Sequence, residues 1–298
     1  MNISELSSPI RLYWDIGPAS DAPLSEYRRI AEEIPKAKFL SLQITETNAG
    51  ISAQTWSILE ALKGKALALS LVAPHTALDA ETLARLGKLS LKVMFASVAA
   101  ADGLDETLRI AKLTSGKPAA GVSFAVTRDT FLDLPEVLSF CVAHRIEHLL
   151  LPMQRLAGQT PCFVLSAQER SALVKRLDPI PRPLWLKITI HDPFLWRAFY
   201  PNVAFPNGGC QAANTMLYIS PDLEVYPCPM LPVRIGTVRD TPLVKIAGSE
   251  QKKGIRKDIL TRPAVCDDCK ESLACKGGCR GRAYVMTGSL ERPDPACR

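Results

Sequence analysis

The positions of the cysteines constrain this chain more than any other feature of its sequence. Seven of its nine cysteines lie in the last 89 of 298 residues, and only Cys141 and Cys162 lie outside that region. The odd total, and a first segment without the basic and apolar runs of an export signal, argue against a disulfide framework. We therefore expect a cytoplasmic protein whose C-terminal cysteines bind metal.

The spacing of these cysteines suits metal ligation. It reads Cys210-x17-Cys228-x37-Cys266-x2-Cys269-x5-Cys275-x3-Cys279-x17-Cys297. Two cysteines separated by two residues can bind one centre, and thiolates are ligands of both zinc and iron–sulfur clusters. Seven exceed the needs of one four-ligand centre, so a second centre with three thiolates is the simplest partition. The spacing alone also allows one zinc site formed by Cys266, Cys269, Cys275 and Cys279.

The region before residue 190 alternates short apolar runs with amphipathic segments. The expected strands are Ile10–Ile16, Lys38–Ile44, Ala66–Ala73, Leu91–Ala96, Gly121–Val126, Ile146–Leu151 and Leu184–Ile190. The expected helices are Ser25–Ile34, Ala53–Leu62, Ala80–Leu86, Leu104–Leu113, Leu134–His144 and Ala167–Leu177. Apolar strands that alternate with helices are typical of parallel sheets covered on both faces. Six such units predict an α/β fold, a partial (β/α)6 barrel, with a doubly wound sheet as the alternative.

The alternation stops near residue 190. An aromatic-rich segment follows, containing Phe194, Trp196, Phe199 and Tyr200, which together with Trp185 predict an interdomain core. Beyond it lie two expected strands, Met216–Ile219 and Glu224–Tyr226, among turns and cysteines. We therefore expect a barrel domain over residues 1–200 and a small cysteine-rich domain over residues 201–298 that metal organises more than apolar burial does.

Charge and hydropathy favour neither nucleic acid nor membrane as a partner. The formal charge is +6, and the basic residues are scattered. The basic residues near the last cysteines are expected to offset the negative charge of a thiolate-bound cluster; they are Lys276, Arg280, Arg282 and Arg292. The apolar runs are too short to cross a bilayer. The segment His144–His148 spells H-x-x-E-H, a zinc-peptidase pattern, but a helix is expected to end inside it, which would separate the histidines.

The C-terminal segment resembles the SPASM domain, the auxiliary iron–sulfur module of radical SAM peptide-modifying enzymes. The resemblance rests on all seven cysteine positions of the pattern C-x9–15-G-x4-C, C-x2-C-x5-C-x3-C and a final C, within the contexts YPC, GGC and DP-x-C. It covers about the last 90 residues. One position departs from the pattern, because Leu223 stands where the motif has glycine five residues before Cys228.

The resemblance implies two [4Fe–4S] clusters. Cluster I would be held by Cys210, Cys228 and Cys279, and cluster II by Cys266, Cys269, Cys275 and Cys297. Fully ligated members have an eighth cysteine about six residues before the first, where this chain has Ala204. The fourth position of cluster I is therefore expected to be open or filled by water, a substrate group or a side chain such as Asn207.

The cluster that cleaves S-adenosylmethionine is expected to be missing. Radical SAM enzymes carry C-x3-C-x2-C after the first barrel strand, whereas Gly17–Leu24 contains no cysteine. The family's GGE, which contacts the methionyl amine, is replaced by Ile44–Thr47, in which only Glu46 is similar. Cys141 and Cys162 are predicted to be core or loop cysteines.

These features predict an accessory protein. The chain is similar to SPASM-only partners encoded beside radical SAM/SPASM maturases, and the resemblance implies electron relay or peptide binding for an active maturase that modifies a ribosomally made peptide. No independent radical SAM activity is expected, and no catalytic residue is assigned. Two alternatives remain: a stand-alone enzyme that uses the open iron as a Lewis acid, and a structural zinc scaffold.

Overall fold

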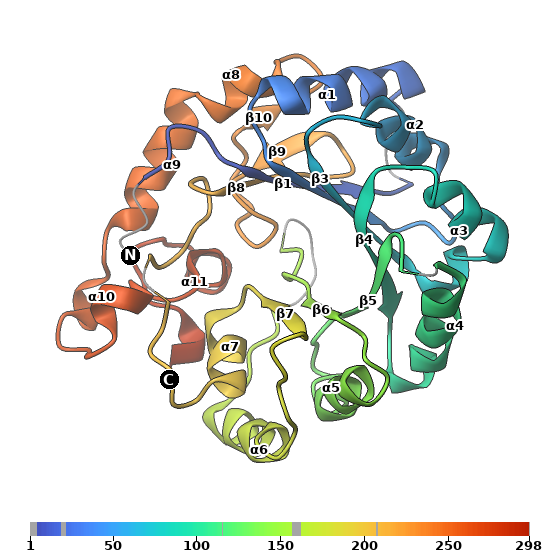
Figure 1. The fold of residues 1–298 in the computed structure, drawn as a ribbon. Coiled ribbons are helices and arrows are strands. Elements are labelled where there is room, and N and C mark those ends of the chain that lie inside the picture. Colours follow the sequence, from blue (N-terminus) through green and yellow to red (C-terminus); the bar gives the residue numbers. More distant parts are fainter. Residues whose placement is uncertain (1–4, 19–21, 115, 157–161, 207, 298) are drawn as a thin grey trace.

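A single curved sheet forms the centre of the molecule (Figure 1). The computed structural model describes residues 5–18, 22–114, 116–156, 162–206 and 208–297. The sheet has ten strands in the order β10-β9-β8-β1-β2-β3-β4-β5-β6-β7. Their bounds are β1 Arg11–Ile16, β2 Ser41–Glu46, β3 Ala68–Pro74, β4 Leu91–Val98, β5 Ala119–Phe124, β6 His148–Leu151, β7 Lys187–Ile190, β8 Met216–Ile219, β9 Glu224–Tyr226 and β10 Gly236–Thr237.

The helices between strands β1 and β7 cover the convex side of this sheet, and the last helices of the chain lie beside it (Figure 1). The helices are α1 Leu24–Lys36, α2 Ala53–Ala61, α3 Ala80–Leu86, α4 Leu104–Thr114, α5 Leu134–Ala143, α6 Ala167–Leu177, α7 Pro193–Phe199, α8 Leu243–Ala247, α9 Glu250–Leu260, α10 Ser272–Cys275 and α11 Arg280–Thr287. Strands β1 to β7 pair in parallel and in chain order, each joined to the next through a helix. This confirms the predicted α/β partial barrel, because a doubly wound sheet would reverse its strand order and place helices on both faces.

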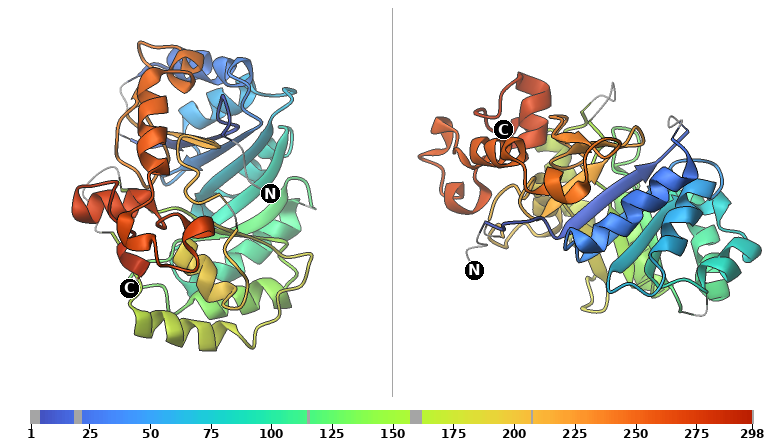
Figure 2. Two further views of the ribbon diagram at one scale, coloured as in Figure 1. Left: turned by 90° about the vertical axis from the view of Figure 1, so that its left-hand side faces the viewer. Right: turned by 90° about the horizontal axis from the view of Figure 1, so that it is seen from above.

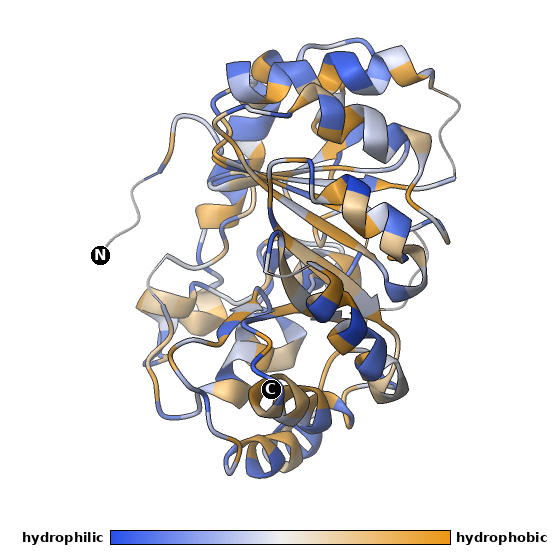
Figure 3. Cartoon of the chain, turned by 45° about the vertical axis from the view of Figure 1, so that its right-hand side comes forward, coloured by the Kyte–Doolittle hydropathy of each residue, from blue (hydrophilic) through white to orange (hydrophobic). Residues whose placement is uncertain are grey.

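Local sequence signals explain where several helices begin. Ser166 accepts a hydrogen bond from the Glu169 backbone N–H while the Glu169 carboxylate accepts one from the Ser166 N–H, so α6 starts with a complete capping box. Asp79 caps α3 in the same way by accepting from the Thr82 N–H. Hydrophobic residues, orange in Figure 3, are frequent along the strands of the sheet. Trp14 of β1 stacks on Tyr27 of α1 with ring centroids 5.8 Å apart.

Some predicted bounds differ from those observed. Strand β2 begins at Ser41 instead of Lys38, because Lys38 adopts a φ of 65° as the chain leaves α1. Between α5 and β6, Arg145 has a φ of 53°, so the H-x-x-E-H segment is a turn and its histidines do not share a helix. Helices α7 to α11 and strand β10 were not predicted.

The sheet continues across the predicted boundary at residue 200. Strand β8 pairs in parallel with β1, aligning Met216 with Arg11, and β9 extends the sheet antiparallel to β8. Figure 2 shows the rest of the C-terminal segment, in orange and red, along one side of the barrel. The two-domain division remains a proposal about sequence character. Within the described ranges, no helix is long and apolar enough to cross a membrane.

Candidate metal centres

A cavity of about 520 Å³ lies between the end of β7 and the start of β8. Cys210, Cys228, Cys275 and Cys279 line it. Three of these cysteines come from distant parts of the chain. Cys210 lies in the loop before β8, Cys228 lies in the loop after β9, and Cys279 is the N-cap of α11. The fold therefore brings together cysteines that are up to 69 positions apart in the sequence.

Three of these thiols influence one another electrostatically. Burial is the main cause that raises the pKa of Cys279, and negative charge on Cys210 or Cys228 raises it further. Burial likewise raises the pKa of Cys228, with the Cys210 charge acting in the same direction. Cys210, Cys228 and Cys279 therefore lie in one neighbourhood, and the raised pKa values of Cys228 and Cys279 keep these two buried thiols protonated until a metal displaces their protons.

The remaining four cysteines form a second neighbourhood. Burial raises the pKa of Cys297, and the charges of Cys269 and Cys266 raise it further. Burial also raises the pKa of Cys275 to about 11, with Cys297 among its neighbours. Cys269 and Cys297 are exposed, so this group lies close to solvent.

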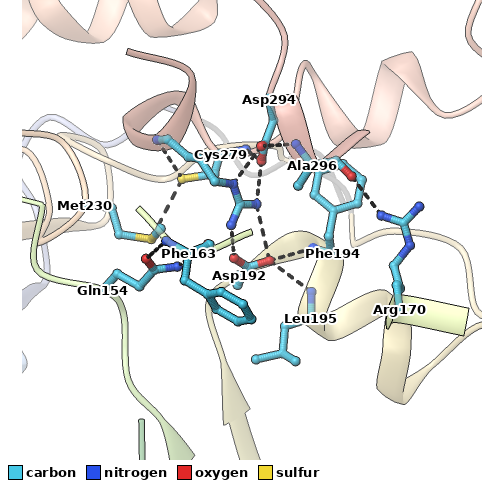
Figure 4. A network of polar contacts seen from close by, with 11 residues as sticks. Gln154, Phe163, Arg170, Asp192, Phe194, Leu195, Met230, Cys279, Asp294 and Ala296 are labelled. Carbon is cyan, nitrogen blue, oxygen red and sulfur yellow. Dashed lines mark hydrogen bonds and ion pairs between the residues drawn. The ribbon is translucent and has the colours of Figure 1, made fainter. Parts of the chain in front are cut away.

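A buried ion-pair hub ties the two cysteine groups to the barrel (Figure 4). The Asp294 carboxylate accepts hydrogen bonds from the Cys279 backbone N–H at 2.8 Å and the Ala296 N–H at 3.0 Å, which places it between the last two cysteines of the chain. Arg282 donates to Asp294 from Nε and Nη2, at 2.7 Å each, and also pairs with Asp192 at the N-cap of α7. The hub therefore fixes the start of α11 relative to α7.

Close backbone packing at Gly281 also positions α11. A Cβ at Gly281 would lie 2.6 Å from the carbonyl carbon of Met230 and would meet its oxygen too. We expect Gly281→Ala to lower the free energy of unfolding by about 1–3 kcal/mol, because backbone cannot move aside as a side chain tip can. Gly254→Ala in α9 is the matched control, since a Cβ there meets nothing within 4 Å and should stabilise by up to about 1 kcal/mol. Equal denaturation midpoints for the two variants would contradict this packing.

Leu223 keeps the backbone conformation that glycine would favour. Its φ is 64°, in the left-handed region, and its side chain is fully buried. The strain of about 1–2 kcal/mol is comparable to what burial of a leucine side chain contributes. The departure from the cysteine motif therefore leaves the turn before β9 intact.

A second cavity, of about 680 Å³, occupies the barrel interior. Met153 lines both cavities, so they share a wall. In the barrel, the Arg155 guanidinium pairs with Asp15 through two contacts, Nη2 to Oδ1 being 2.9 Å. Tyr218 donates a hydrogen bond to the same carboxylate at 3.0 Å.

The carboxylate of Glu46 is fully engaged by its own chain. It accepts hydrogen bonds from the backbone N–H of Asn48 and Ser52 and from the hydroxyls of Ser52 and Thr55, at 2.6–3.0 Å. Glu46 thereby supports the first turn of α2. Its hydrogen bonds are thus made within the protein, unlike the ligand contact expected of a GGE segment.

The other predicted site residues have separate places. Cys141 is buried in α5, and Cys162 is half-buried beside the barrel cavity. Ala204 is exposed, and Asn207 lies outside the described residues. In the part of the chain that the structure describes, no three His, Cys, Asp or Glu side chains are close enough to hold a single metal ion. The ligands of a four-iron cluster each bind a different iron, so they stand further apart than the ligands of one ion.

Sequence reasoning missed His191, which lines the cysteine cavity directly after β7. Burial is the main cause that lowers its pKa to about 4, and the charges of Arg11 and Arg155 act in the same direction, so the ring is neutral at pH 7. It also missed Met230, whose sulfur is 3.8 Å from that of Cys279. An isolated histidine or methionine carries no spacing signal, so only the fold reveals these neighbours.

Comparison with known sequences identifies the cysteine-rich segment. Residues 210–270 match the SPASM family model, described as an iron–sulfur cluster-binding domain. A protein of Nitratidesulfovibrio vulgaris named AdoMet-dependent heme synthase is 34% identical over 201 residues, which are 60% of this chain and 54% of that protein. One of the same name from Methanosarcina barkeri is 30% identical over 89 residues, 30% of this chain and 25% of that protein. The chain thus spans about half or less of the length of these relatives.

Solved structures share the fold at low identity. SuiB of Streptococcus suis has a TM-score of 0.73 at 15% identity, covering 99% of this chain and 78% of SuiB. The enzyme anSMEcpe, solved with bound AdoMet, has a TM-score of 0.66 at 15% identity, covering 96% of this chain and 94% of its own. The chain therefore has the fold of radical SAM/SPASM enzymes and carries, within residues 210–270, a SPASM iron–sulfur cluster-binding domain.

Proposed function

We propose that this protein carries two [4Fe–4S] clusters, has no cluster of its own that cleaves S-adenosylmethionine, and relays electrons for a separate radical SAM/SPASM maturase acting on a ribosomally made peptide. The observation that carries the proposal is a complete set of seven SPASM cysteines on a barrel whose Gly17–Leu24 loop has none. Cytoplasmic location is part of the proposal.

The neighbourhoods of the cysteines support the two ligand sets. The thiol neighbours of Cys279 are Cys210 and Cys228, and those of Cys297 are Cys269 and Cys266. Cys275 lines the cavity of the first set, but its thiol neighbour is Cys297 of the second. Cys210, Cys228 and Cys279 would hold cluster I. Cys266, Cys269, Cys275 and Cys297 would hold cluster II. When bound, the clusters would supply one-electron redox chemistry.

The different burial of the two cysteine groups supports an electron relay. Cys269 and Cys297 are exposed, whereas Cys228 and Cys279 are buried around a cavity that shares Met153 with the barrel interior. A cluster near the surface can exchange electrons with another protein, and a deeper one can pass them inward. The arrangement therefore gives a route from the surface toward the barrel.

The barrel supports the absence of radical initiation. Glu46 is occupied by the N-terminal turn of α2, and Asp15 is occupied by Arg155 and Tyr218. Groups at the carboxyl ends of the first two strands are thus committed to contacts within the protein. No free carboxylate is left at these two positions to bind the methionyl amine.

The second candidate function is to position the peptide. The observation that favours it is the 680 Å³ barrel cavity, together with a SuiB structure that is bound to its precursor peptide SuiA. Met153 forms a wall shared by this cavity and the cavity proposed for cluster I. If positioning were the only role, loss of cluster II in the double variant Cys266→Ala/Cys269→Ala would leave product formation by the maturase unchanged, whereas loss of an electron relay would stop product formation.

Iron content tests the proposal. Anaerobically reconstituted protein should contain about eight irons per chain, and the double variants Cys210→Ala/Cys228→Ala and Cys266→Ala/Cys269→Ala should each retain about four, because each leaves at most two cysteine ligands on one cluster. Cys141→Ala is the matched control: its cysteine is buried in α5, away from both groups, so about eight irons should remain.

Cofactor cleavage gives an independent readout. With dithionite and S-adenosylmethionine, the eight-iron protein alone should form no 5′-deoxyadenosine. One zinc with no iron would refute the cluster assignment, and cleavage of the cofactor would refute the accessory role.

A further inference from the structure

The cavity of cluster I contains one neutral imidazole besides its cysteines. His191 follows the last residue of β7 and lines the cavity together with Cys210, Cys228 and Cys279. Strand β7 is the free edge of the sheet, and the cysteines come from the loops around β8 and β9 and from α11. His191 therefore contributes to the cavity from the barrel side.

We propose that His191 is the fourth protein ligand of cluster I, binding iron through Nδ1. The inference rests on the proposed function, because it requires a cluster on the three cysteines. The expectation was a position that is open or filled by water, a substrate group or a side chain such as Asn207. The proposal replaces it with one specific side chain, so that the barrel itself supplies a ligand. A substrate thiolate would then have to displace an imidazole to reach the cluster.

The contacts of the ring with Tyr13 suit this role. The Nε2 atom of His191 is 3.1 Å from the Tyr13 hydroxyl, and the two rings meet edge to face with centroids 5.9 Å apart. Nδ1 has no hydrogen-bond partner among the described residues. A histidine ligand commonly uses its second ring nitrogen in a hydrogen bond that fixes the tautomer. Donation from Nε2–H to Tyr13 would leave the Nδ1 lone pair for iron.

The alternative ligands fit less well. The thioether of Met230 is 3.8 Å from the Cys279 sulfur and carries no charge, whereas imidazole is known to replace thiolate on iron–sulfur clusters. Cys275 lines the cavity, but Cys297 is its thiol neighbour and it completes cluster II. His191 is thus the donor that is not otherwise used.

Pulsed EPR on the reduced protein tests the assignment. The chain has four histidines, so ¹⁵N-histidine labelling reports on few sites. We expect a nitrogen coupling typical of coordinated imidazole in the native protein and in the control Met230→Leu, and its loss in His191→Ala. In His191→Cys the cluster I potential should fall, because thiolate in place of imidazole lowers the potential of such clusters.

The possible failures are distinguishable. About eight irons without a coordinated-nitrogen coupling, or a coupling that persists in His191→Ala, would overturn the histidine assignment and leave the two-cluster function standing. A cluster I spectrum that changes in Cys275→Ala while cluster II is retained would assign the fourth position to Cys275 and overturn it as well. Protein that binds no iron would refute the proposed function itself.

Discussion

Replacing Arg282 by alanine is expected to lower the free energy of unfolding by about 3–5 kcal/mol, the usual effect of breaking a buried ion pair from one side. The Arg282 side chain is 2% exposed and that of Asp294 is fully buried. Without the guanidinium, Asp294 would keep only its two backbone donors, and Asp192 would lose its ion pair in a partly buried site. An unpaired carboxylate in such surroundings is far more costly than the pair.

Urea denaturation of the native and variant proteins measures this effect. Lys253→Ala is the matched control, because Lys253 pairs with Glu250 on the exposed surface of α9 and should contribute less than about 0.5 kcal/mol. Arg282→Lys should recover part of the loss, since an ammonium restores the charge but not the two-pronged contact. A loss below 1 kcal/mol for Arg282→Ala would show that Asp294 does not depend on this partner.

The barrel was predictable because its signals are local. Short apolar runs such as Ala66–Ala73, and caps such as Asp79 and Ser166, act within a few residues, and the structure follows them. Helix α7 was missed because it is only seven residues long and three of them are aromatic. Its start depends on Asp192, which accepts from the Phe194 and Leu195 N–H groups and also pairs with Arg282 from α11. Such a long-range partner leaves no periodic pattern.

The site was predictable only as far as spacing carries information. The spacing and resemblance of the cysteines indicated where metal would bind, and the match of residues 210–270 to an iron–sulfur domain agrees with this. Arg282 had been interpreted as a cation that offsets cluster charge. The structure pairs it with Asp192 and Asp294, while Arg280 lies near the thiols of Cys210, Cys266 and Cys279. The sequence alone therefore could not show that Arg282 forms a structural ion pair while Arg280 lies near the thiols, because both roles depend on tertiary contacts.

If the proposed cluster II is present, removing its iron is expected to unfold the segment around it while the barrel stays folded. Between Ala264 and Lys276 only Cys266 and Ser272 are buried, and the apolar side chains of Val265 and Leu273 are 72% and 79% exposed. The segment therefore has almost no core of its own. Metal binding would supply its folding free energy, on the order of 10 kcal/mol for structural thiolate sites.

Hydrogen exchange on chelated and reconstituted protein distinguishes this expectation from a preformed lobe. Without iron, the amides of α10 and of the turn before it should lose at least about a hundredfold in protection against exchange. The reason is that local unfolding of this segment would then break no metal–sulfur bonds and few apolar contacts. Helix α9 is the internal control: Ile255 and Ile259 bury against the main core, so its protection should persist. Equal protection of α10 in both states would mean that backbone contacts alone hold the cysteines in place, and the domain would then be a scaffold into which clusters fit instead of one that they organise.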